Sequence, residues 1–263
     1  MPRFFISPGS ISGDGSKIIL TGDDAHHVSR SLRMRPGEKL TVCDGLGTDY
    51  FCRTSAFTGD TVTLDVEETA KSRAEPPVLI TVYQALVKGD KFDTVVQKSV
   101  ECGASAICPF YSRNCIVRPT DDEEKRRQRR ARIAREAAMQ SGRGVIPSVR
   151  GCISFGEMIR NAAESDAALF CYEGDGTEQL PRLLEDIKRK WTGDHLDQQD
   201  RHIDDERQRR IAVIVGPEGG FAPGEAEAAE KSGLYMTALG PRILRTESAA
   251  EFALACIYYA FEV

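Results

Sequence analysis

The chain has 263 residues, of which 41% are hydrophobic and 29% charged, and its formal net charge is −5. This composition is typical of a soluble globular protein of one or two domains. No apolar run approaches the roughly 20 residues that a membrane-spanning helix needs, and the N-terminus lacks the long apolar stretch of a signal peptide. We therefore expect a cytoplasmic protein with no membrane partner.

Eight cysteines are spread along the chain without a C-x-x-C pair. This spacing argues against a zinc site and favours reduced cysteines packed in the core. His195 and His202 lie among acidic residues in a polar segment, but a solvated surface is the simpler interpretation. We predict no metal.

Residues 1–72 are predicted to form a small all-β barrel. The strands expected there are residues 17–21, 39–43, 50–56 and 61–66, separated by turns rich in glycine, proline and aspartate. Between the first two strands we expect a helix over residues 24–33, with Asp23 or Asp24 as its N-cap.

Residues 73–263 are predicted to form an α/β domain, because strands and helices alternate after a polar linker at residues 70–77. The expected strands are residues 78–85, 106–110, 167–172, 211–215 and 234–239. The expected helices are residues 90–102, 121–141 and 154–164 (with a capping box of Ser154 and Glu157), one from Pro223, and one from Thr246 to the C-terminus. This alternation is typical of a mostly parallel sheet with helices on both faces. Residues 193–210 are almost purely polar, which favours a surface insertion.

The last two strand–turn–helix units carry the strongest functional signal. The turn after the strand 211–215 reads Gly-Pro-Glu-Gly-Gly, and the turn after the strand 234–239 contains Arg242, Arg245 and Glu247. Parallel strands place such turns at one edge of the sheet, where open α/β sheets bind ligands. Glycines there let the backbone approach a ligand closely. The first turn is neither a Walker loop nor a dinucleotide-binding motif.

These turns resemble those of the ribosomal RNA small subunit methyltransferase E family, which belongs to the SPOUT class of methyltransferases. The resemblance extends over nearly the whole chain except roughly residues 176–210. The segments that carry it are residues 2–5, 26–33, 88–91 (Lys-Gly-Asp-Lys), 137–143, 216–220 and 238–249.

The resemblance implies a fold and an activity. The fold is a PUA-like barrel, which binds RNA, followed by a knotted SPOUT methyltransferase domain. The last two units would form its trefoil knot, although rules of chain connection alone argue against a knot. The implied activity is methylation of N3 of a uridine in 16S rRNA of the small (30S) ribosomal subunit, with S-adenosyl-L-methionine as the cofactor. The family is dimeric, so a homodimer is expected.

The family holds its cofactor mainly through backbone groups of three loops. Carried over to this chain, the cofactor-binding residues are Tyr172, Glu173, Gly174, Gly216, Pro217, Glu218, Gly219, Gly220, Leu239, Gly240, Arg242, Ile243 and Leu244. Two roles stay open for Glu218: it either balances the positive charge of the cofactor or accepts backbone N–H bonds that order its turn.

Methylation at N3 of uridine requires removal of an imide proton, for which Glu247 is the expected general base. Arg245 is expected to stabilise negative charge on the base carbonyls. An internal Arg–Glu ion pair that orders the loop is the competing interpretation for these residues.

The expected RNA-binding residues are Arg3, His26, Arg30, Arg33 and Arg143. Seven basic and no acidic residues lie in the helical stretch 125–135, which either grips phosphates or forms a solvated face balanced by nearby acids. A flipped-out uridine is the expected substrate geometry, because pairing hides N3.

The C-terminal helix has one apolar stripe through Ala249, Phe252, Ala253, Cys256, Ile257 and Ala260, and further apolar residues on its other faces. Such a helix is either deeply buried or part of a subunit interface.

Two other functions stay open. One is a SPOUT methyltransferase that acts on a ribose 2′-hydroxyl or another base. The other is a non-catalytic ribosome-assembly factor that binds RNA.

Overall fold

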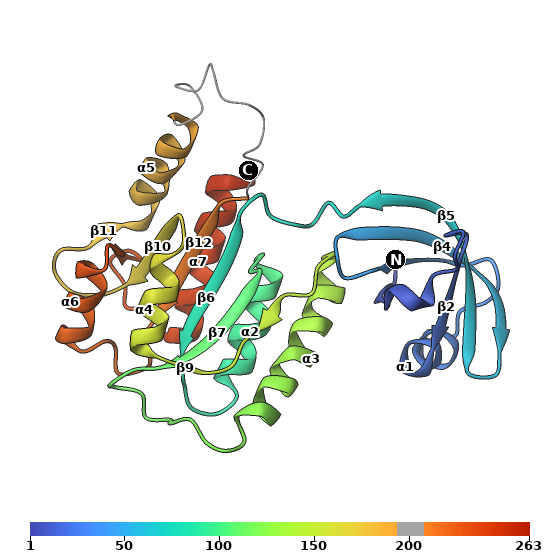
Figure 1. Ribbon diagram of the computed structural model, residues 1–263, viewed down its shortest axis with the longest axis horizontal. Helices are drawn as coiled ribbons and strands as arrows, with labels where there is room; N and C mark the ends of the chain where they lie inside the picture. Colours follow the sequence, from blue (N-terminus) through green and yellow to red (C-terminus); the bar gives the residue numbers. More distant parts are fainter. Residues whose placement is uncertain (194–207) are drawn as a thin grey trace. The chain divides into compact units, whose positions relative to one another are not determined.

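The computed structural model describes residues 1–193 and 208–263 (Figure 1). The chain divides into two compact units. Unit 1 contains Met1–Glu75 and Ala138–Ile146, and unit 2 contains Pro76–Ala137 and Pro147–Val263. The segment Ala138–Ile146, which we expected in the second domain, therefore groups with the first. No helix among the described residues is long and apolar enough to cross a membrane.

Unit 1 is built on a five-stranded sheet with the order β1-β3-β4-β5-β2. Its strands are β1 (Arg3–Phe5), β2 (Lys17–Thr21), β3 (Lys39–Cys43), β4 (Thr48–Thr58) and β5 (Thr61–Lys71). All pairs are antiparallel except β1 with β3. The four strands expected from the sequence are confirmed, and β4 and β5 are longer than predicted. The core beneath the sheet includes Phe4, Ile18, Val28 and Leu64.

The predicted helix between β2 and β3 is shorter than expected. It consists of α1 (Gly22–His26) followed by a π-helical turn at His27–Ser31. The N-cap is Thr21, which makes no side-chain capping bond, so the prediction of Asp23 or Asp24 as the cap is wrong. Both aspartates lie in the first turn instead, where carboxylates interact favourably with the free N–H groups of a helix.

The returning segment of unit 1 is bonded to the β3–β4 region. Gly47 N–H donates to the Gly144 carbonyl at 3.1 Å, and the Cys43 thiol donates to the same oxygen at 2.9 Å. A Cβ on Gly144 would lie 2.3 Å from Ser72 Cβ, so this close approach requires glycine. These long-range contacts explain why the segment belongs to unit 1.

Unit 2 contains an eight-stranded sheet with the order β11-β13-β10-β12-β6-β7-β8, and β9 pairs with β7. Its strands are β6 (Leu79–Ala85), β7 (Ala106–Tyr111), β8 (Ser148–Val149), β9 (Ile153–Ser154), β10 (Ala167–Cys171), β11 (Glu178–Gln179), β12 (Arg210–Val215) and β13 (Tyr235–Ala238). Its helices are α2 (Lys91–Glu101), α3 (Glu123–Ser141, whose last residues group with unit 1), α4 (Phe155–Ala163), α5 (Leu180–Gly193), α6 (Pro223–Lys231) and α7 (Thr246–Phe261). Every strand pair is parallel, which confirms the predicted parallel sheet.

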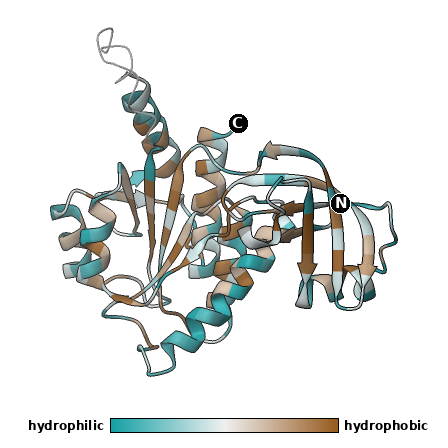
Figure 2. Ribbon diagram, turned by 45° about the vertical axis from the view of Figure 1, so that its right-hand side comes forward, coloured by the Kyte–Doolittle hydropathy of each residue, from teal (hydrophilic) through white to brown (hydrophobic). Residues whose placement is uncertain are grey.

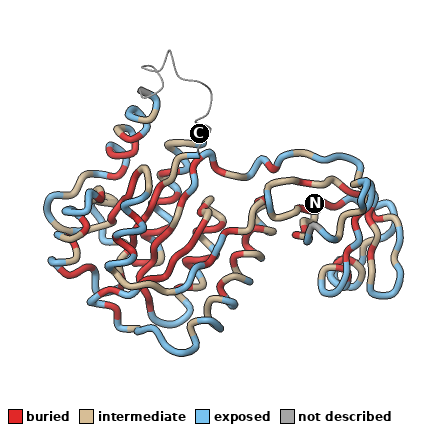
Figure 3. The backbone as a smooth tube through the Cα atoms, viewed as in Figure 1, coloured by how far each residue is buried: buried red, intermediate tan, exposed pale blue. Residues whose placement is uncertain are grey.

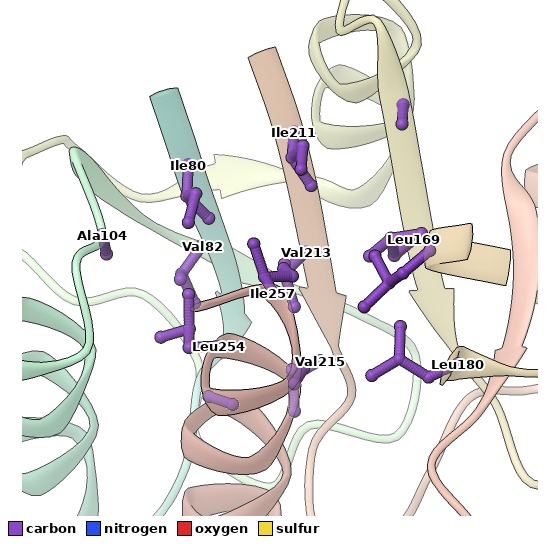
Figure 4. Packing of buried hydrophobic residues seen from close by; sticks show 14 of the residues in the cluster. Ile80, Val82, Ala104, Leu169, Leu180, Ile211, Val213, Val215, Leu254 and Ile257 are labelled. Carbon is purple, nitrogen blue, oxygen red and sulfur yellow. The ribbon is translucent and has the colours of Figure 1, made fainter. Parts of the chain in front are cut away.

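Helices cover both faces of this sheet, as predicted. On one face, α2, α5 and α7 pack against alternate residues of β6, β10 and β12, and Figure 4 shows Val82, Val213 and Leu254 in this layer. On the other face, Phe155 of α4 contacts a cluster of aromatic rings from Phe110, Phe170 and Phe221. The central strands are therefore buried on both faces (Figure 3), which explains their almost continuous apolar sequences (Figure 2).

Four elements of unit 2 escaped prediction from the sequence: the 14-residue helix α5 and the two-residue strands β8, β9 and β11. The helix was missed because charged residues interrupt its apolar positions, of which Leu180, Leu183, Leu184 and Ile187 are buried. The expected polar insertion at residues 193–210 overlaps α5 only at Gly193. Residues 194–207, with His195 and His202, lie outside the described part of the chain.

Two helix starts in unit 2 have contrasting caps. The capping box before α4 is confirmed: Ser154 Oγ accepts from Glu157 N–H at 3.3 Å, and the Glu157 carboxylate accepts from Ser154 N–H at 2.8 Å. Before α6, the Glu225 carboxylate accepts from Ala222 N–H at 2.9 Å. Ala222 has the same extended backbone as Ser154 but no side-chain oxygen to return the bond.

We therefore expect Ala222→Ser to complete the second capping box and to raise the free energy of unfolding by about 1 kcal/mol. Ser154→Ala is the matched opposite change and should lower it by a similar amount. Urea unfolding of both variants measures the effect. If Ala222→Ser were no more stable than the parent chain, burial of the new hydroxyl would offset the added bond.

Candidate active site

A cleft of about 750 Å3 lies in unit 2 at the carboxyl ends of neighbouring strands. Its walls are the loops that follow β10, β12 and β13, together with the first turn of α7. The two turns singled out in the sequence follow β12 and β13, and β10 lies between these strands. The loop after β10 therefore lies between the two turns and completes the cleft.

The structure brings nearly all predicted cofactor-binding residues into this one cleft. Those that line it are Tyr172, Glu173, Gly174, Gly216, Pro217, Glu218, Gly220, Leu239, Gly240, Arg242, Ile243 and Leu244, and the predicted catalytic residues Arg245 and Glu247 line it too. Gly219 is the exception. It packs against Asn114, whose side-chain amide donates to the Gly219 and Gly220 carbonyls at 3.2 Å each. Gly219 therefore belongs to the contact that orders the turn.

The backbone of the cleft offers hydrogen-bond donors. Within the described residues, the N–H groups of Gly240, Arg242, Ile243 and Leu244 donate to no protein acceptor. Gly220 closes a turn by donating to the Pro217 carbonyl at 2.9 Å and has a left-handed backbone with φ 65°, which residues with a Cβ rarely adopt. Because backbone N–H groups without a protein acceptor can donate to a ligand, these loops are suited to hold a polar ligand.

A buried hydrogen-bond network, which the sequence did not reveal, fixes the start of α7. The Thr246 hydroxyl donates to the Gly216 carbonyl at 2.7 Å and accepts from Gln84 Nε2 at 2.8 Å. Gln84 is fully buried and Thr246 is 7% exposed. The network joins the end of β6, the glycine turn and the first residue of α7. The one available signal was a glutamine at the end of an otherwise apolar strand.

Glu218 orders its turn by accepting hydrogen bonds from another loop. Its carboxylate accepts from Lys88 N–H at 3.1 Å and from Lys91 Nζ at 3.4 Å. Burial raises the pKa of the Glu218 carboxyl, but the backbone N–H groups of Glu218 and Lys88 and the Lys91 ammonium outweigh it, so the pKa lies below its ordinary value. Ionised Glu218 therefore stabilises the fold above the ordinary carboxyl pKa, and this contribution is lost as the pH falls through the lowered value.

Glu247 and Arg245 both line the cleft, but they do not form the internal ion pair that we considered. Glu247 Oε2 lies 3.9 Å from Lys91 Nζ. This oxygen is buried and accepts no hydrogen bond from the described residues. Arg242 and Arg245 are exposed. Cys171, also in the cleft, is no nucleophile at neutral pH, because burial raises the pKa of its thiol to about 12.

Three of the predicted RNA-binding residues lie on the surface of unit 1. His26 on α1, Arg30 on the π-helical turn and Arg33, two residues after the end of that turn, are all exposed. Arg33 has a left-handed backbone with φ 53°, which is uncommon for a residue with a Cβ. The surface formed by these three residues is called the basic turn below.

Arg3 and Arg143 lie inside unit 1 instead. Arg3 donates to both carboxylate oxygens of Asp49 at 2.7 and 2.8 Å, and Arg143 is 2% exposed and donates to Glu75 at 2.6 Å. Arg3 also donates to the Arg143 carbonyl at 3.3 Å. The Arg3–Asp49 pair connects β1 with β4, and the bond from Arg3 to the Arg143 carbonyl connects the returning segment to the sheet. The two arginines therefore have structural partners where we expected RNA contacts.

Several basic residues of helix α3 have acidic or aromatic partners within unit 2. Arg126 and Arg127 pair with Glu123 and Glu124 one turn away. Arg129 pairs with Asp90 and Asp93 near the start of α2. The neighbouring Arg130 guanidinium lies over the Phe92 ring, 3.9 Å from its centroid. These contacts favour the interpretation of α3 as a face balanced by local acids.

Helix α7 has both a buried and an exposed apolar side. Ala249, Ala253 and Ile257 are buried as predicted. Phe252, which we placed in the same stripe, is 39% exposed, and Tyr259 is 74% exposed. The exposed aromatic side also includes Tyr258.

Comparison with known protein families identifies the class. Residues 74–258 match the family described as "RNA methyltransferase domain", and residues 20–67 match "RNA methyltransferase PUA domain". With the parallel sheet and the cleft at its carboxyl edge, these matches define an RNA methyltransferase that carries a PUA domain.

Individual relatives narrow the class. The chain is 30% identical to ribosomal RNA small subunit methyltransferase E of Bacillus subtilis over 93% of this chain and 90% of the relative. It is 33% identical to the Mesomycoplasma hyopneumoniae protein of that name over 98% and 99%. The crystal structure of the Neisseria gonorrhoeae protein of that name, bound to S-adenosyl methionine, superposes with a TM-score of 0.79 at 29% identity, covering 98% of this chain and 97% of that one. The chain belongs to the ribosomal RNA small subunit methyltransferase E family.

The buried network predicts that Thr246 contributes to the stability of the fold. Thr246→Val leaves the Gly216 carbonyl without its donor and Gln84 without one acceptor, so the free energy of unfolding should fall by about 1–3 kcal/mol. Thr246→Ser keeps the hydroxyl and should retain most of the stability. Urea unfolding checks both, and equal stability of the two variants would contradict the role of the network.

Proposed function

We propose that this chain transfers a methyl group from S-adenosyl-L-methionine to N3 of a uridine in 16S rRNA of the small (30S) ribosomal subunit. The observation that carries the proposal is the convergence of the loops after β10, β12 and β13 on one cleft. The same cleft is lined by Glu247, whose buried Oε2 accepts no hydrogen bond from the described residues. Family membership supports the RNA substrate, and the resemblance noted in the sequence supports the N3 position.

The cleft fits the cofactor. Its volume of about 750 Å3 lies within the range of about 300–1,000 Å3 typical of small-molecule sites. The N–H groups of Gly240, Arg242, Ile243 and Leu244 and the glycine turn 216–220 would hold polar groups of the ligand. The loop 172–174 would form the opposite wall. When bound, S-adenosyl-L-methionine supplies an activated methyl group next to a positively charged sulfur.

Proton removal at N3 is assigned to Glu247. Its buried oxygen lacks a hydrogen-bond donor among the described residues, which suits an acceptor for the imide N–H of uridine. Arg245, exposed at the rim of the same cleft, would donate to a uracil carbonyl as negative charge develops there. The chain's own contribution is therefore one acceptor and one cation placed around the base.

RNA docking is assigned to the basic turn of unit 1. His26, Arg30 and Arg33 are exposed and form no ion pair with an acidic side chain among the described residues. Arg3 and Arg143 are proposed to act indirectly, by ordering unit 1. The target uridine would leave its stack to expose N3.

Three finer features complete the proposal. The SPOUT trefoil knot is supported by the placement of β10 between β12 and β13 and by the return of α7 to β6 and β12. A homodimer is supported by the exposed aromatic side of α7, with Phe252, Tyr258 and Tyr259, because contiguous apolar surface favours association. The expected location is the cytoplasm, with the ribosomal subunit as partner.

The test is methyl transfer from labelled S-adenosyl-L-methionine to small subunits that lack the modification, followed by reverse transcription across the 16S rRNA. We expect label and one new stop at a uridine, because a methyl on N3 blocks base pairing. Label without a stop would indicate a ribose or another base as target. Cofactor binding without label would indicate a different RNA substrate.

The matched inactive control is Gly220→Val. The left-handed backbone of Gly220 (φ 65°) disfavours a β-branched residue, so both the calorimetric heat of cofactor binding and the label should be lost. A wild-type chain that binds no cofactor would favour a non-catalytic assembly factor.

The basic turn predicts a specific loss of RNA affinity. Arg30→Ala combined with Arg33→Ala should weaken RNA binding and flatten its salt dependence by up to about one log unit per lost phosphate contact. Arg53→Ala is the control, because Glu67 already neutralises Arg53 at 2.7 Å in the same unit. Unchanged affinity and slope in the double variant would exclude the basic turn as the docking surface.

A further inference from the structure

Lys91 reaches the cleft from outside the three loops that form its walls. It is the first residue of α2 and follows β6 through the turn at residues 88–90. Its ammonium lies 3.4 Å from Glu218 Oε1 and 3.9 Å from Glu247 Oε2. Lys91 is therefore the contact between the carboxylate of the glycine turn and the carboxylate at the start of α7.

The position of Lys91 is unfavourable for the helix that carries it. The N-terminus of a helix carries a partial positive charge, so a lysine in the first turn is disfavoured by up to about 1 kcal/mol. The helix dipole therefore does not favour a cation at this position. Contact with two acidic side chains across the cleft does.

The two carboxylates need this cation. The side chains of Glu218 and Glu247 are 24% and 20% exposed, so water screens them only in part. Within residues 1–193 and 208–263, no other lysine or arginine lies within 4.0 Å of either carboxylate. Arg242 and Arg245 line the same cleft without reaching them. Removing Lys91 would leave two like charges near each other, which favours their separation.

We propose that Lys91 is a positioning residue of the methyl-transfer site, which holds Glu247 in place for the substrate and Glu218 in place for the cofactor turn. The inference rests on the proposed function. It adds a residue that the three cofactor loops do not contain. Because one ammonium contacts both carboxylates, a disturbance of Lys91 should affect the chemical step through Glu247 and cofactor affinity through Glu218.

The experiment is a pair of double-mutant cycles in the full chain. Lys91→Met, Glu247→Gln and their combination are compared by kcat with small subunits as substrate. Lys91→Met, Glu218→Gln and their combination are compared by calorimetric affinity for S-adenosyl-L-methionine, which requires no methyl transfer. Lys91→Arg restores the charge and serves as the rescue variant.

Lys98→Met is the matched control. Lys98 is on the same helix, its side chain is also 39% exposed, and it also pairs with a glutamate, Glu101, at 2.8 Å. It does not line the cleft. Any general effect of removing a paired lysine from α2 should therefore appear in Lys98→Met too.

We expect Lys91→Met to lower kcat by about 10- to 100-fold, the size of effect that a misplaced catalytic group produces. The loss should be much smaller in the Glu247→Gln background, because Lys91 then has no base to position. Cofactor affinity should fall in the single variant and change little further when Glu218→Gln is present. Lys91→Arg should recover most of both losses, and Lys98→Met should match wild type.

Additive effects in both cycles, or a Lys91→Met variant that matches Lys98→Met, would overturn the inference while wild-type transfer still supports the proposed function. A wild-type chain that neither binds the cofactor nor transfers label would overturn both. Binding without transfer would refute the proposed RNA substrate, and the calorimetric cycle with Glu218 would then decide the role of Lys91.

Discussion

The strand order of the larger sheet is the constraint on which the candidate site depends. β10 pairs in parallel with both β12 and β13, so the three loops that follow these strands open at one edge. The order is held by burial: every residue from Ile211 to Val215 is at most 2% exposed, with α7 packed on one face and aromatic rings on the other. Another order would bring apolar side chains of β12 into water.

The cleft combines a rigid base with an open rim. Beneath it, the buried contacts of Thr246 with Gln84 and Gly216 connect three segments that are distant in the sequence, and unpaired polar groups there would be costly. At the rim, Arg242 and Arg245 are exposed, and several N–H groups of the loop after β13 donate to no acceptor within the described part of the chain. Lys91 is part of helix α2, outside the walls of the cleft, and its ammonium contacts two carboxylates of the cleft. The buried contacts beneath the cleft therefore fix the positions of the few charged side chains that line it.

The arginines of unit 1 have different environments: some form ion pairs within the unit, and others are exposed. Arg3 and Arg143 are held by Asp49 and Glu75, whereas Arg30 and Arg33 are exposed. In the sequence, all four look like equivalent candidates for RNA contact. The partners of Arg3 and Arg143 lie 46 and 68 residues away, so the local sequence pattern gave no sign of them. The same limit applies to Lys91, whose partners are more than 100 residues away.

The sequence by itself determined the local elements with strong periodicity and the two turns that line the cleft, because apolar alternation, glycine turns and capping residues act over a few positions. It also predicted that the residues of these turns would meet at one sheet edge, since parallel strands require it. It missed α5, whose charged residues interrupt its apolar stripe, and it placed residues 138–146 in the other domain. Only the tertiary structure decided which charges are buried in pairs, that Gln84 supports Thr246, and that Lys91 contacts both carboxylates. Such contacts depend on strand order and helix packing, which bring together residues that no local pattern relates.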